Sequence, residues 1–94
     1  MKTNWARAFR IVRAVEGVQQ QTMAKRIGIS VSGLSLIESG KRNPSLQVID
    51  RFCNATATPI VALAQLASLP YQDNFQSLVD EMKRLRQAVK ERGK

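Results

Sequence analysis

The 94-residue sequence contains no histidine, one cysteine and few aromatic residues. Without histidine, it lacks the most common metal ligand and general base of proteins. Its seven acidic residues are scattered without a metal-ligand spacing. The sequence therefore predicts no enzyme, and it gives no reason to expect a metal or another cofactor. The lone Cys53 cannot form an internal disulfide, which favours a reducing cytoplasm.

Long hydrophobic runs are also absent. The most apolar stretch, residues 60–69, is too short to span a bilayer, and charges interrupt the N-terminal segment, unlike a signal peptide. The few aromatic residues offer no evident stacking platform for single-stranded nucleic acid. We therefore expect a cytoplasmic protein without a membrane partner.

Positive charge dominates the sequence, with a formal net charge of +8. Nine of the fifteen basic residues but only three of the seven acidic ones lie in residues 1–68, so this part carries +6. Such an excess neutralises phosphates in nucleic-acid-binding proteins, but it also occurs on ordinary solvated surfaces. Charge alone leaves both interpretations open.

The spacing of apolar residues predicts helices throughout and no alternation typical of strands. We expect an all-α fold with five helices in residues 1–69 and one more in residues 70–94. Gly17, Gly28 and Gly40 are expected to end the first three helices, and Ser30 and Ser45 to cap the third and fourth. The residues expected to face the core are Trp5, Ala8, Phe9, Val12, Val15, Met23, Ala24, Ile27, Leu34, Ile37, Leu46, Ile49 and Phe52.

The segment after Pro70 has a different pattern. Its apolar residues repeat in steps of three and four, as in a coiled-coil heptad; they are Phe75, Leu78, Met82, Leu85 and Val89. This stripe predicts a dimerisation helix. Because two heptads are short for an autonomous coiled coil, the fifth helix is expected to take part. Alternatively, the last helix folds back on the body of the domain.

The segment from Gly17 to Ser45 resembles the Cro-and-repressor-type (XRE-like) helix-turn-helix family, and the resemblance covers about residues 5–66. The matching positions, in order, are Gln20, Ala24, Gly28, Ser30, Leu34, Ile37, Glu38, Gly40 and Asn43-Pro44-Ser45. The resemblance implies a five-helix lambda-repressor-like DNA-binding domain at residues 1–69. Its motif would span residues 20–40, and the third helix would lie in the major groove of duplex DNA.

The resemblance also implies roles for individual residues. Arg13 and Glu38 would pair to tie the first helix to the third, and Gln20 would hold a phosphate and support the third helix; a merely solvated Gln20 is the alternative. The predicted base contacts are Val31, Ser32, Gly33, Leu36 and Arg42. The predicted phosphate contacts are Gln19, Gln20, Ser39, Lys41 and Asn43.

The third helix departs from the commoner pattern because its outward residues include no Arg, Asn or Gln, the side chains that read guanine and adenine by paired hydrogen bonds. Ser32 is the one clear hydrogen-bonding reader, while Val31 and Leu36 suit thymine methyl groups. Arg42, just beyond the helix, is a candidate for either a base or a phosphate contact. We therefore expect phosphate contacts and DNA shape to supply much of the affinity.

Two functions fit these residues. The first is a homodimeric, nucleoid-associated repressor or autoregulator that reads an inverted-repeat operator. The second is an antitoxin-type protein whose last helix binds a partner protein, with DNA binding secondary.

Overall fold

The computed structural model describes residues 3–68 and 75–92, with side chains in the last helix described up to Arg84 and at Gln87. These ranges are all-helical and contain no strand, which confirms the predicted fold class. The helices are α1 (Trp5–Glu16), α2 (Gln20–Ile27), α3 (Val31–Glu38), α4 (Leu46–Ala55), α5 (Ile60–Ser68) and α6 (Phe75–Arg92). None of them is sufficiently long and apolar to cross a membrane.

Local chemistry explains where the helices begin and end. Side-chain oxygens of Asn4, Ser30 and Ser45 each accept a hydrogen bond from a backbone N–H three residues later, at 2.9–3.2 Å. These bonds satisfy donors that the first turn of a helix leaves without a partner. Gly17 and Gly28 follow α1 and α2 in the left-handed conformation, with φ of 69° and 72°, which costs glycine little.

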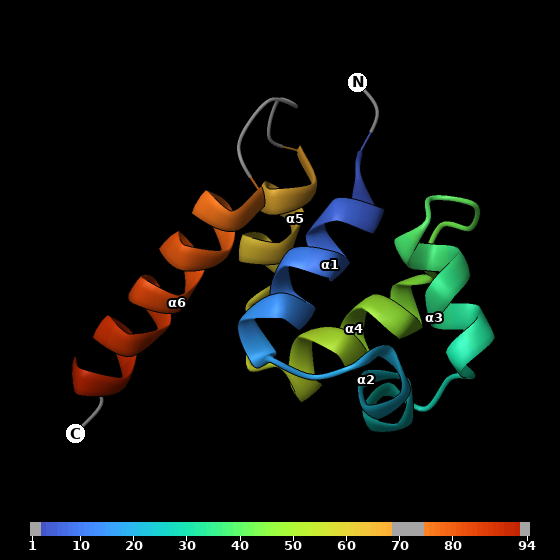
Figure 1. Ribbon diagram of the computed structural model, residues 1–94, viewed down its shortest axis with the longest axis horizontal. Helices are drawn as coiled ribbons and strands as arrows, with labels where there is room; N and C mark the ends of the chain where they lie inside the picture. Colours follow the sequence, from blue (N-terminus) through green and yellow to red (C-terminus); the bar gives the residue numbers. More distant parts are fainter. Residues whose placement is uncertain (1–2, 69–74, 93–94) are drawn as a thin grey trace.

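The core forms around α1, which packs against α3, α5 and α6, while α2 packs against α3 and α4 (Figure 1). At its centre the rings of Phe9 and Phe52 stack with centroids 4.0 Å apart and planes 14° from parallel. Arg7, itself buried, donates a hydrogen bond to the carbonyl of Leu66 at 3.3 Å, and so ties α1 to α5. The first five helices therefore share one core.

Two expectations about the core need correction. Leu46 was expected to be buried, but it is 82% exposed. It is the first residue of α4, and the buried stripe of this helix begins one turn later, at Ile49. Conversely, Ile11 is fully buried although the predicted face of the first helix did not include it. Because α1 has neighbours on three sides, its buried surface is wider than a single stripe.

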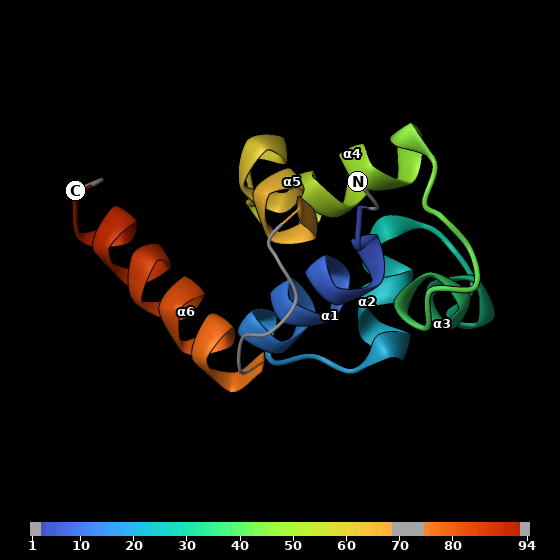
Figure 2. The same cartoon turned by 90° about the horizontal axis from the view of Figure 1, so that it is seen from above.

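Helix α6 folds back onto α1, the alternative that the sequence left open (Figures 1 and 2). Val79, which lies outside the predicted stripe, is 2% exposed, and Leu78 and Met82 pack against the core from partly buried positions. Phe75 remains 39% exposed. Beyond this contact, α6 points away from the other helices (Figure 2). The side chains of the other stripe residues, Leu85 and Val89, lie outside the described part of the structure.

This packing predicts that α6 contributes to stability. Replacing Val79 with Ala removes two buried methyl groups, so we expect the free energy of unfolding to fall by about 2 kcal/mol. Ser77→Ala is the matched control, because Ser77 is exposed on the same helix and such surface changes alter stability by less than about 0.5 kcal/mol. Urea unfolding followed by circular dichroism measures both. Equal stabilities of the two variants would show that α6 does not pack on the core.

Candidate nucleic-acid interface

Helices α2 and α3 are joined by a tight turn and packed closely together. Ala24 of α2 is 1% exposed, and its small side chain allows the two helices to approach. On α3, Leu34 and Ile37 are 0% and 3% exposed and hold the helix to the core. Because these two residues face inward, the opposite side of α3 faces outward.

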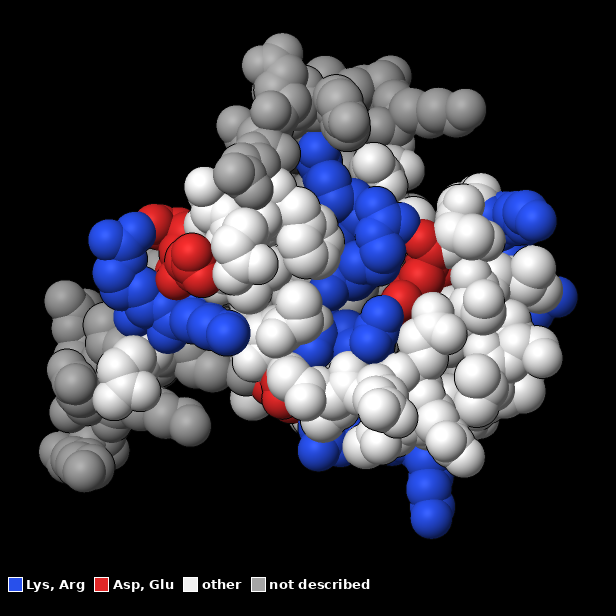
Figure 3. Space-filling view, viewed as in Figure 1, with Lys and Arg blue, Asp and Glu red and all other residues white. Residues whose placement is uncertain are grey.

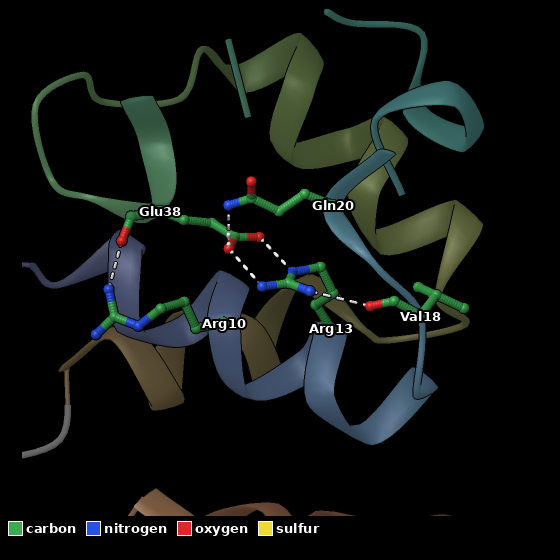
Figure 4. A network of polar contacts seen from close by, with 5 residues as sticks. All are labelled: Arg10, Arg13, Val18, Gln20 and Glu38. Carbon is green, nitrogen blue, oxygen red and sulfur yellow. Dashed lines mark hydrogen bonds and ion pairs between the residues drawn. The ribbon is translucent and has the colours of Figure 1, made fainter. Parts of the chain in front are cut away.

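A network of polar contacts around Glu38 connects the first three helices (Figure 4). The guanidinium of Arg13 donates two hydrogen bonds to the Glu38 carboxylate, from Nε at 2.8 Å and from Nη2 at 2.9 Å. Gln20 Nε2 donates a third at 3.0 Å. Arg13 also donates from Nη1 to the carbonyl of Val18 at 3.0 Å. The structure therefore brings together the two residues expected to pair, and adds Gln20 to them.

Arg10 adds a contact that the sequence analysis missed. Its Nη1 donates a hydrogen bond to the backbone carbonyl of Glu38, at the last residue of α3 (Figure 4). The carbonyls at the end of a helix carry partial negative charge, so a cation there is favourable. Arg10 lies one turn before Arg13 on α1 and so shares the side of the helix that faces α3, which could have predicted this contact from the sequence.

The effect of this network on stability depends on how deeply its charged groups are buried. The side chain of Glu38 is 3% exposed and that of Arg13 is 24% exposed. Charge-assisted, two-bond pairs are the strong kind, but their net contribution to stability is small because both charges lose water. Removing only one partner leaves a buried charge without compensation, which is costly. The orientation of α3 therefore depends on this pair being intact.

The outward surface of α3 carries no charge. Val31 is 43% exposed, Ser32, Ser35 and Ser39 are exposed, and Leu36 is partly buried. In the space-filling view, Lys and Arg side chains gather over α1, and others stand at the edge beyond α3, while the lobe formed by α3 is uncharged (Figure 3). The uncharged outward surface of α3 therefore has exposed cations at its far edge, while an acidic surface, red in Figure 3, separates it from the cations over α1.

Gly33 differs from its expected position on the exposed surface. It is buried, and a Cβ atom built on it would lie 3.1 Å from Ser30 Oγ and 3.8 Å from Nη1 of Arg42. The capping hydroxyl and the guanidinium therefore cover this position. The missing side chain makes room for other protein groups, and a direct base contact from Gly33 stays a prediction.

The residues predicted to contact phosphates lie at the two ends of the motif. Gln19 is exposed just before α2 and its side chain caps no helix N–H, whereas Gln20 points toward Glu38. Beyond α3, Lys41 and Asn43 are exposed. Ser39 is also exposed, and its hydroxyl donates to the carbonyl of Leu36 at 3.1 Å.

Two closely packed helices joined by a glycine turn, the second with an outward face, define a helix-turn-helix. A family model of a helix-turn-helix domain matches residues 6–66, and the chain belongs to this family. The chain is also 47% identical over 45 residues to the uncharacterized HTH-type transcriptional regulator YazB of Bacillus subtilis; the match covers 48% of this chain and 65% of YazB. The comparison with solved structures found no match.

The Glu38 network predicts a large effect of a nearly isosteric change. Glu38→Gln keeps the shape of the side chain but leaves Arg13 without its counter-charge, so we expect the free energy of unfolding to fall by about 2–4 kcal/mol. Glu81→Gln is the control, since Glu81 pairs with Arg84 on α6 where the two side chains are 52% and 75% exposed, and such surface pairs contribute at most about 1 kcal/mol. Thermal unfolding compares the two variants. A loss no larger for E38Q than for E81Q would contradict the structural role.

Proposed function

We propose that this chain is a sequence-specific transcription regulator of double-stranded DNA that acts as a homodimeric repressor or autoregulator in the cytoplasm, at the nucleoid. The observation that carries the proposal is the outward, uncharged face of α3, held from behind by Leu34, Ile37 and Glu38 and bordered by exposed cations. A helix presented in this way fits the major groove, whose base edges it reads. The HTH-type regulator YazB supports the same class of function.

Base contacts and phosphate contacts are assigned to different residues. Ser32 is exposed in the first turn of α3, where base contacts concentrate in this geometry. Val31 and Leu36 provide apolar contact for thymine methyl groups. The proposed phosphate contacts are Gln19, Gln20, Ser39, Lys41 and Asn43. Gln20 can serve both roles, because its amide has a second N–H besides the one donated to Glu38.

A second copy of the chain would bind through residues 59–92. In this segment Ile60 is 53% exposed and Val61 is 64% exposed, both in the first turn of α5, and Phe75 is exposed at the start of α6. The adjacent Ile60 and Val61 form an exposed apolar group, and such groups are candidate interaction sites. Two-fold pairing would place two α3 helices in successive major grooves, about 34 Å apart along the duplex.

The main test is selection of bound duplexes from a random pool, followed by a salt titration on the selected site. We expect inverted repeats with A·T-rich half-sites. Neutralising about six phosphates predicts a slope of log affinity against log salt near about −5. A slope near about −1, or no enrichment of any sequence, would contradict the proposal.

One substitution tests the assignment of Ser32. Ser32→Ala removes a hydroxyl from the outward face of α3, so we expect a loss of about 1–3 kcal/mol in binding and relaxed preference at one base position. Asn54→Ala, at an exposed position of α4 outside residues 59–92, should leave binding unchanged. A uniform loss on all sequences would make Ser32 a phosphate contact.

Sedimentation of the purified chain tests the dimer. We expect a dimer that Val61→Glu converts to a folded monomer, because the substitution places two like charges in the proposed contact. Leu46→Glu is the matched control, since Leu46 is an exposed leucine outside residues 59–92, and it should remain dimeric. A monomeric parent chain would contradict self-association and favour a partner protein at α6.

A further inference from the structure

We infer that Arg42, rather than a residue of α3 itself, is the main reader of guanine, and that Gly33 is the positioning residue that makes room for it. This inference rests on the proposed DNA binding and deepens it. The sequence left Arg42 as either a base contact or a phosphate contact, and this inference makes it a base contact that determines specificity. Three observations carry it.

The first observation is where the guanidinium of Arg42 lies. Arg42 follows α3 in the sequence, yet its Nη1 lies 3.8 Å from the position that a Cβ of Gly33 would occupy. Gly33 belongs to the first turn of α3, where its N–H bonds to Ser30 Oγ at 2.9 Å. The side chain therefore runs back along the helix from its end to its beginning. The first turn of a reading helix is the part that contacts base edges.

The second observation is how the backbone of Arg42 is held. The N–H groups of Lys41 and Arg42 both donate to the carbonyl of Leu36, at 3.0 and 3.1 Å. These bonds fold the chain back over the last turn of α3. The Cα of Arg42 is thereby fixed beside the helix, so a side chain of this length reaches the first turn from a defined point.

The third observation is that no acidic side chain in the described part of the chain pairs with the guanidinium. Among residues 3–68 and 75–92, no acidic side chain forms an ion pair with Arg42, and Arg42 is exposed. It lies instead beside the first turn of α3, where the helix dipole makes a cation unfavourable. A group with hydrogen-bond acceptors placed next to the guanidinium would offset this unfavourable interaction with the helix dipole. Guanine offers O6 and N7 side by side, which match the paired donors of a guanidinium.

The outward residues of α3 leave this role unfilled. They comprise apolar side chains and the serines Ser32 and Ser35, with Ser39 just beyond the helix, and none of them can donate two hydrogen bonds to guanine. A guanidinium beside Gly33 would add the missing donor pair at the edge of this surface. A Cβ at position 33 would lie 3.1 Å from Ser30 Oγ, and a longer side chain there would compete for space with the guanidinium, which lies 3.8 Å from that Cβ.

The experiment measures base preference in duplexes selected by the unaltered chain. At one guanine of each half-site, Arg42→Ala should lose roughly tenfold to hundredfold in discrimination against other bases. Arg42→Lys should lose most of the same preference, because an ammonium is a point charge without the paired geometry. Lys41→Ala is the matched control, and it should weaken binding to all sequences equally.

Modified DNA and a second variant make the test specific. Replacing that guanine by 7-deazaguanine removes the N7 acceptor, so binding by the parent chain should fall while binding by R42A should not change. Gly33→Leu fills the space of the guanidinium and should cost the same preference, with no further loss in the G33L/R42A double variant. Thermal unfolding of each variant shows whether it folds.

The outcomes separate this inference from the proposed function. If the parent chain selects a duplex but R42A weakens all sequences alike and lowers the salt slope by about one, Arg42 contacts a phosphate and the inference is wrong. The same conclusion follows if R42K keeps the full preference for guanine. If the parent chain selects no duplex, the proposed function itself fails.

Discussion

The architecture depends on one buried carboxylate. Glu38 stands at the end of α3 with 3% of its side chain exposed, and a charge so placed must be compensated. Arg13 supplies the charge from α1 and Gln20 supplies an amide from the start of α2. Three helices therefore meet at one group with fixed geometry. Helix α3 is short and its first turn consists of valine, serine and glycine, which are poor helix formers, so it depends on these contacts and on the burial of Leu34 and Ile37.

The residues of α3 that stabilise the fold lie on a different side of the helix from those proposed to contact DNA. The inner side of the helix carries the apolar anchors and Glu38, and the outer side carries small neutral groups that hold no other element in place. The outer side can therefore change without loss of the fold. Gln20, the first residue of α2, supports the fold through its bond to Glu38 and is also a proposed phosphate contact. A phosphate bound there would also fix the orientation of α3.

The sequence predicted the features set by local chemistry. The caps at Ser30 and Ser45 and the turn at Gly28 follow from rules that act within a few residues. Leu46, Val79 and the covering of Gly33 depend instead on which element lies nearby in space. A helical stripe shows that a surface will be buried, but not whether its partner is α1 of the same chain or a second copy. The heptad pattern of α6 was compatible with packing on α1 and with pairing to a second copy of the chain.

A cross-linking experiment tests most directly whether the outward face of α3 meets the duplex. A cysteine placed at Ser35 in a Cys53→Ser background carries a photoreactive group on the exposed side of α3, and one at Asp80 carries it on the exposed side of α6. The structure predicts that the Ser35 derivative cross-links to bases within a selected half-site and that the Asp80 derivative does not. Efficient cross-linking from Asp80 with none from Ser35 would show that another surface binds the DNA.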